Sequence, residues 1–190
     1  MPPKGKKVKP NIKQILALRH LMNGVIAHPT DTVYGLACLA SNPSAINQMI
    51  SLKRRDKSKG LILLASDIKY VEPYIDPTFI SDLFDGVQMS SDQPTTFLVP
   101  ANSNTSTMLT GGSPLIAVRI TDNALVRYFC ENSDSALVST SANVQGQKTA
   151  STLLQLRSQF NNELSFVLPP TKHNNKASVI INLISGERIR

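Results

Sequence analysis

Short apolar segments of strand length recur along this chain, and segments with helical spacing separate them. Strands that alternate with helices predict an α/β domain, and apolar strands of this kind are typical of a sheet covered on both faces. The chain has 190 residues, of which 41% are hydrophobic, which suffices for one domain with a substantial core. The expected strands are residues 25–27, 61–65, 96–99, 115–120, 136–138 and 178–183.

Helices between these strands are indicated by apolar spacing and by capping residues. Residues 12–22 carry apolar side chains at helical spacing, and Gly24 is positioned to end that helix. Asn42 before Pro43 is typical of an N-cap followed by the first helical residue. Further helices are expected from Asp76–Pro77, from Thr121 or Asp122, and over residues 149–160.

Positive charge is concentrated in two short segments. The chain has 20 Lys and Arg against 13 Asp and Glu, a net charge of +7. Residues 1–10 contain four lysines and no acid, and residues 53–59 contain five basic residues and one acid. We therefore expect a flexible basic tail over residues 1–10, a folded domain over residues 11–190, and one discrete anion-binding site on a nearly neutral body.

Several classes of protein and site are excluded by the sequence. The longest strongly apolar stretch, residues 61–65, is far shorter than the roughly 20 residues of a membrane helix, and the N-terminus does not resemble a secretory signal. Cys38 and Cys130 lie far apart, so we expect two buried free thiols and a cytoplasmic protein. No P-loop or GxGxxG motif occurs, so a nucleotide must be held in another way.

Two polar segments follow expected secondary structure at the places where α/β sheets bind ligands. In the first, the basic loop (residues 53–60), several cations can converge on one phosphate chain, and a solvated surface loop is the alternative. The second, the polar segment (residues 139–143), places hydroxyls and an amide directly after a strand. Its alternative is a local turn, and without a paired His or acid we expect binding rather than nucleophilic catalysis.

Residues 28–35 and Arg119 each allow two interpretations. Residues 28–35 combine hydroxyls, a carboxylate and an aromatic ring, and within them we expect His28 to be structural or solvent-facing rather than a base or metal ligand. Arg119 stands inside an apolar strand, where a buried cation needs a partner. A carboxylate or phosphate ligand and an internal salt bridge are equally acceptable partners.

Taken together, these segments resemble the YrdC/TsaC family, the threonylcarbamoyl-AMP synthases, from about Val25 to Arg190. The resemblance implies a single domain with a twisted, open, mixed sheet flanked by helices and a concave, positively charged cavity. The motifs that carry it are HPTDTVYGL at 28–36, Lys53-x-Arg55 with Lys59-Gly60-Leu61, Pro94 to Phe97, Val118-Arg119-Ile120, Ser139 to Asn143, Ala177-Ser178-Val179, and Gly186 to Arg190.

The same resemblance implies a reaction in which L-threonine, bicarbonate and ATP give threonylcarbamoyl-AMP and pyrophosphate. Magnesium is expected on the ATP phosphates, with no metal ligands from the protein. The product would pass to a separate threonylcarbamoyl-transferase complex and supply N6-threonylcarbamoyladenosine in tRNAs that read ANN codons. By resemblance, the catalytic residues are Lys53 and Arg55, and threonine is bound by Thr32, Tyr34 and Arg119. The same resemblance implies that ATP is contacted by Arg55, Lys59, Thr96, Ser139, Ser141, Asn143 and Ser178.

The chain departs from the family pattern in three places. Ser91-Asp92-Gln93 replaces a common Trp-Pro-Gly beside Thr96, while Asp56 and Thr121 stand where proline is frequent. Two other functions therefore stay open. One is a non-catalytic module of the same fold that binds double-stranded RNA or tRNA through the tail and the basic loop. The other is a family member that binds ATP but turns over poorly.

Overall fold

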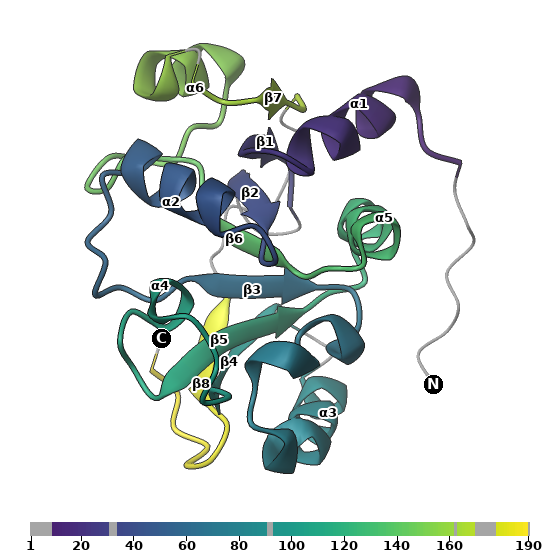
Figure 1. Cartoon of the computed structure of the whole chain (residues 1–190), viewed down its shortest axis with the longest axis vertical. Coiled ribbons are helices and arrows are strands. Elements are labelled where there is room, and N and C mark those ends of the chain that lie inside the picture. Colours follow the sequence, from purple (N-terminus) through teal and green to yellow (C-terminus); the bar gives the residue numbers. More distant parts are fainter. Residues whose placement is uncertain (1–8, 31–33, 91–92, 162, 170–177, 190) are drawn as a thin grey trace.

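The computed structural model describes residues 9–30, 34–90, 93–161, 163–169 and 178–189. One eight-stranded sheet runs through it, in the strand order β7-β1-β2-β6-β3-β5-β4-β8 (Figure 1). β3 and β5 pair in parallel, whereas β6 pairs antiparallel with β2 and β3, so the sheet is mixed, as expected. The strands are β1 (Ile26–His28), β2 (Gly35–Leu39), β3 (Ile62–Ala65), β4 (Thr95–Pro100), β5 (Leu115–Ile120), β6 (Leu137–Ser141), β7 (Phe166–Val167) and β8 (Val179–Asn182).

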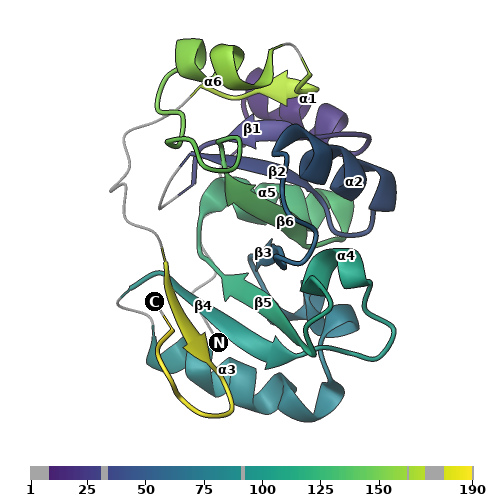
Figure 2. The same ribbon diagram turned by 90° about the vertical axis from the view of Figure 1, so that its left-hand side faces the viewer.

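Helices flank the sheet on both sides, which confirms the α/β class. Helices α1, α5 and α3 lie along one side, and α2 and α4 lie along the other (Figures 1 and 2). In the described ranges, no helix is long and apolar enough to cross a membrane. The helices are α1 (Ile12–Leu21), α2 (Pro43–Leu52), α3 (Ile80–Met89), α4 (Thr107–Thr110), α5 (Ala124–Ser133) and α6 (Leu153–Phe160), with short 3₁₀ turns at Ile68–Tyr70, Glu72–Tyr74 and Pro77–Phe79.

The predicted cap of α2 is confirmed. The Asn42 side chain accepts a hydrogen bond from the Ala45 N–H at 3.0 Å, and Pro43 is the first helical residue. This arrangement satisfies one of the N–H groups that a helix start leaves without an intrahelical partner. α2 then buries its apolar side, including Ile46 and Met49, and ends at Leu52, directly before the basic loop.

Other helix boundaries differ from the expected ones because different side chains supply the capping hydrogen bonds. α5 is capped by Asn123 rather than by Thr121 or Asp122, and α6 is capped by Thr152, later than expected. Asp76 caps a short 3₁₀ turn that precedes α3. α1 ends at Leu21, ahead of Gly24, and a Cβ atom at Gly24 would collide with the Ser165 side chain, so that glycine permits close packing instead.

Strand β2 was not expected, although all five of its residues are buried. Its sequence, Gly35 to Leu39, contains glycine, alanine and cysteine, which have little intrinsic preference for strands. Pairing with β1 on one side and β6 on the other makes it a strand. β7 and α4 are also additional to the expected elements, since two and four residues give too little periodicity to recognise.

One row of side chains across the sheet stays partly exposed, and we call it the open row. Its members are register partners on five neighbouring strands, and each is half-buried. Their chain neighbours Val138, Leu63 and Val118 point to the opposite face and are fully buried. Helices therefore leave part of one face uncovered, unlike the expected sheet covered on both faces. The open row consists of Ser139, Ile62, Ala117, Leu98 and Asn182.

Candidate active site

Four of the predicted site residues share the face of the open row. Ser139 is itself a member of the row. Ser141, Arg119 and Thr96 each lie two residues from a member on their own strand, and alternate residues of a strand point to the same face. The sheet register thus brings groups from β6, β5 and β4 to one surface, although they are far apart in the sequence.

The β5 and β4 side of this face is the more deeply buried part. Arg119 lies opposite Leu64 of β3 and is 7% exposed, while Thr96 is fully buried. The Thr96 and Ser178 hydroxyl oxygens are 2.8 Å apart and share a hydrogen bond, which links β4 to the residue before β8. A cation and a hydroxyl pair are therefore held on the same side of the sheet.

Lys53 is not a solvated loop cation. It is the C-cap of α2, and its side chain is only 2% exposed. Its Nζ atom donates to the main-chain oxygens of Ser141 at 2.5 Å and Asn143 at 2.7 Å. The first residue of the basic loop is therefore bound directly to the polar segment, and the alternative of a freely solvated loop does not hold for it.

The buried position of Lys53 changes its protonation. Loss of hydration, together with the smaller effect of the neighbouring positive charge of Arg55, lowers the pKa of Lys53 to about 7. These two effects outweigh the oxygen acceptors, which favour the charged form. The ammonium and the neutral amine are consequently both populated near neutral pH.

Arg55 is held by the end of its own loop. Its Nη2 atom donates to the Gly60 oxygen at 2.6 Å and its Nε atom to the Lys59 oxygen at 3.2 Å. Burial lowers the pKa of Arg55, but a guanidinium stays charged at any physiological pH. The structure thus brings Lys53 and Arg55 together, whereas the Lys59 side chain is exposed and that residue contributes its carbonyl.

The polar segment is shaped by its own side chains. The Ser141 hydroxyl donates to the Asn143 Oδ1 atom at 2.6 Å, and the Asn143 Nδ2 atom donates to the oxygens of Val144 and Gln147 at 2.9 Å. The local turn foreseen as the alternative is therefore present. It leaves these groups beside Lys53, so the turn also builds the edge of the site.

Two glutamines that the sequence did not single out support the polar segment. Gln145 accepts a hydrogen bond from the Asp56 N–H at 3.0 Å, and Gln159 of α6 accepts one from the Val144 N–H at 2.9 Å. Gln145 lies 89 residues from Asp56, so nothing in the local sequence indicates its contact. The antiparallel pairing of β6 with β3 creates this proximity.

The predicted threonine-binding residues near β2 are only partly described. Tyr34 is fully buried, its hydroxyl donates to the Leu168 oxygen, and burial raises its pKa far above the ordinary value. Thr32 lies outside the described residues, as do residues 1–8 of the tail and the departures Ser91 and Asp92. His28 is fully buried with its ring 6.3 Å from that of Phe129, as expected for a structural side chain.

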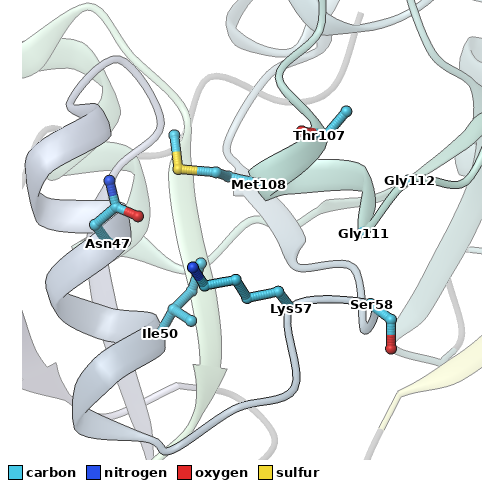
Figure 3. A pocket seen from close by; sticks show the side chains of 8 residues that line it. All are labelled: Asn47, Ile50, Lys57, Ser58, Thr107, Met108, Gly111 and Gly112. Carbon is cyan, nitrogen blue, oxygen red and sulfur yellow. The ribbon is translucent and has the colours of Figure 1, made fainter.

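A separate cavity of about 490 Å³ lies beside the basic loop, between α2 and α4 (Figure 3). None of the predicted site residues lines it. Across the ranges that the structure describes, no three His, Cys, Asp or Glu side chains gather in a way that could hold a metal ion. Cys38 and Cys130 are both free and buried, as expected. The cavity is lined by Asn47, Ile50, Lys57, Ser58, Thr107, Met108, Gly111 and Gly112.

Comparison with known sequences identifies relatives of this chain. A model of the Sua5/YciO/YrdC family, described as telomere recombination, matches residues 20–190. A threonylcarbamoyl-AMP synthase of Pasteurella multocida is 36% identical over 181 residues, which cover 95% of this chain and 98% of the relative. A threonylcarbamoyl-AMP synthase of Idiomarina loihiensis is 39% identical over 149 residues, which cover 78% of this chain and 80% of the relative.

Solved structures share the fold. P. abyssi Sua5 complexed with L-threonine matches with a TM-score of 0.77 and 20% identity over 92% of this chain and 51% of that chain, so this chain spans about half of its length. E. coli YciO matches with a TM-score of 0.71 and 18% identity over 94% of this chain and 92% of that chain. These structural likenesses show the fold alone. The family model and the sequence relatives show that the chain belongs to the Sua5/YciO/YrdC family.

Proposed function

We propose that this protein is an L-threonylcarbamoyl-AMP synthase. In the proposed reaction, the amine of L-threonine attacks the carbon of bicarbonate, and a carbamate forms as water leaves. A carbamate oxygen then attacks the α-phosphorus of ATP. The bond from that phosphorus to the bridging oxygen breaks, and pyrophosphate departs with the electron pair.

One observation carries the proposal. A cation-bearing loop is bound to a polar turn at the edge of a partly exposed sheet face, and Arg119 and Thr96 lie on that same face. Both steps of the reaction bring anions together, so they require positive charge and orientation more than a tuned nucleophile. The identity to named synthases over most of the chain supports the same activity over a non-catalytic RNA-binding module.

The proposed roles follow from this arrangement. Lys53 and Arg55 stabilise the bicarbonate and phosphate oxygens, and the Arg119 guanidinium pairs with the threonine carboxylate. Tyr34 and Thr32 form the amino-acid pocket, in which the buried Tyr34 acts through its ring and its link to Leu168. Magnesium arrives on the ATP phosphates. Lys59, Thr96, Ser139, Ser141, Asn143 and Ser178 complete the ATP contacts within the proposed positively charged cavity.

The proposal is tested by pyrophosphate release from the purified protein. Release is expected only when ATP, L-threonine and bicarbonate are all present, and mass spectrometry of the mixture is expected to show threonylcarbamoyl-AMP. Pyrophosphate release without threonine would contradict the proposal. ATP binding without any turnover would instead identify the family member with impaired catalysis.

A contact with tRNA is a separate part of the proposal. Residues 1–10 carry four lysines, and such a segment binds a phosphate backbone through charge alone. Deleting residues 1–10 is expected to weaken tRNA binding in low salt while pyrophosphate release persists. Release of the product to a separate transferase complex is tested by adding that complex with tRNA and measuring the modified adenosine.

A further inference from the structure

We propose that Gln145 is a positioning residue that sets the location of Arg55 relative to the polar segment. This inference rests on the proposed function for the identity of the reaction, but its geometric basis is independent of it. Gln145 is exposed and does not belong to the hydrophobic core, so packing does not explain its two long-range hydrogen bonds.

Gln145 holds the basic loop at two points. Its main-chain N–H donates to the Lys53 oxygen at 2.8 Å, and its side-chain Oε1 accepts from the Asp56 N–H at 3.0 Å. These two points lie on either side of Arg54 and Arg55. Lys53 completes the connection in the other direction, because its Nζ atom donates to the Ser141 and Asn143 oxygens.

The two hydrogen bonds of Gln145 to Lys53 and Asp56, which we call the clamp, act on the main chain from which the Arg55 side chain extends. The Arg55 N–H is bonded to the Ile50 oxygen at 3.0 Å, and the guanidinium is held by the far end of the loop. Among the described residues, the Gln145 side chain is the one group that ties Asp56, the residue after Arg55, to the end of the polar segment. Without it, the Asp56 N–H turns to solvent and this part of the loop gains freedom.

The polar segment is itself anchored, so the clamp has a rigid support. Gln159 of α6 accepts from the Val144 N–H at 2.9 Å and donates to the Lys148 oxygen at 2.9 Å. The chain of contacts therefore runs from α6 through the polar segment and Gln145 to the basic loop. A shift of about 1 Å in a positioned group can lower turnover by orders of magnitude, so a single surface hydrogen bond here has a kinetic effect.

The test compares three variants of the full chain. Gln145→Leu removes the acceptor, whereas Gln145→Glu keeps an acceptor oxygen at the same distance from the main chain. Gln147→Leu is the control, because it changes a nearby exposed side chain while the main-chain bonds of that residue to the turn remain. Gln145→Leu is expected to lower kcat/KM for ATP about tenfold. The KM for threonine is expected to stay unchanged, because the hydrogen bonds of Gln145 go to Lys53 and Asp56 and not to Arg119.

The matched variants separate positioning from general destabilisation. Gln145→Glu is expected to recover most of the lost activity, Gln147→Leu is expected to behave like the unmodified protein, and all melting temperatures should agree within about 3 °C. Equal losses in the Leu and Glu variants at position 145, a rise in the threonine KM, or an unaffected Gln145→Leu protein would overturn the inference.

A second readout keeps the inference distinct from the proposed function. ATP affinity is measured by calorimetry on the same three variants, without threonine or bicarbonate. If the unmodified protein binds ATP but releases no pyrophosphate, the proposed function fails, while a weaker ATP affinity in Gln145→Leu alone still supports the clamp. If the protein does turn over, equal ATP affinities and equal kcat values in all variants would refute the clamp and leave the proposed function intact.

Discussion

The Lys53 Nζ atom lies 2.7 Å from the main-chain oxygen of Asn143, a residue 90 positions later in the chain. This contact joins the C-terminus of α2 to the turn that follows β6. The Lys53 side chain is only 2% exposed, and its contacts give hydrogen-bond partners both to main-chain carbonyl oxygens and to the lysine ammonium. The same lysine therefore supports the local fold and supplies charge to the proposed site.

Replacing Lys53 is expected to affect stability as well as turnover. In Lys53→Met, the Asn143 oxygen loses the Lys53 donor and the Ser141 oxygen keeps the bond from the Asn143 N–H, and an unsatisfied buried polar group costs about 1–3 kcal/mol. Urea unfolding should show this loss, and pyrophosphate release should be abolished. The matched control is Lys57→Met, an exposed change that should leave stability within about 0.5 kcal/mol. A fully stable Lys53→Met protein would contradict the structural role.

The lowered pKa of Lys53 makes stability depend on pH. Between pH 7 and the ordinary lysine value of 10.5, the unfolded chain keeps a proton that the folded chain has released. Stability contributed by this group therefore rises with pH across that range, and it is lowest below pH 7, where a buried charge must be retained. The free energy of unfolding, measured in urea from pH 6 to 9.5, should rise relative to Lys53→Met. Parallel pH profiles for the two proteins would argue against the shifted pKa.

Gly111 is expected to control the position of the basic loop. Its φ is +67°, and a Cβ atom there would lie 2.5 Å from the Ser58 oxygen and 2.6 Å from the Gly60 nitrogen. Gly112 has a φ of +82° but open space around it, so Gly112→Ala should cost only the backbone strain, about 1 kcal/mol. Gly111→Ala should cost more and also lower turnover, because Gly60 carries an oxygen that holds Arg55. Thermal unfolding and pyrophosphate release measure both effects, and equal costs at the two glycines would rule out the close approach.

The hydroxyl pair of Thr96 and Ser178 should be energetically coupled. Their oxygens are 2.8 Å apart in a buried setting, so Thr96→Val and Ser178→Ala each remove one side of the same hydrogen bond. A double-mutant cycle in urea is expected to give a coupling energy of about 1 kcal/mol. Additive effects of the two changes would show that the link between β4 and β8 contributes nothing.

Arg55→Lys should impair turnover although the charge is kept. The guanidinium donates to the Lys59 and Gly60 oxygens through different nitrogens, whereas an ammonium is a single point that cannot reproduce this planar fork. Turnover is expected to fall at least about tenfold. Arg54→Lys is the control, because Arg54 is the exposed neighbour. Equal pyrophosphate release by the two variants would mean that charge alone matters at Arg55.

Much of the secondary structure could be predicted because it depends on local chemistry. The helix cap at Asn42 is confirmed, since a side chain and an amide three residues apart decide it. Strand β5 around Arg119 agrees with its apolar pattern. Strand β2 could not be predicted in this way, because its small residues become a strand only through pairing with β1 and β6.

The residues of the candidate site were indicated by the sequence, but their mutual arrangement was not. Composition and motif order pointed to the basic loop, to the polar segment and to Arg119. Only the tertiary structure decided that Lys53 is buried, that Gln145 spans the two loops and that one sheet face stays partly open. The reason is physical, because local hydrogen bonding and hydrophobic periodicity act over only a few residues. These contacts instead depend on the position of β6 between β2 and β3, which brings together residues that are about 90 positions apart in the chain.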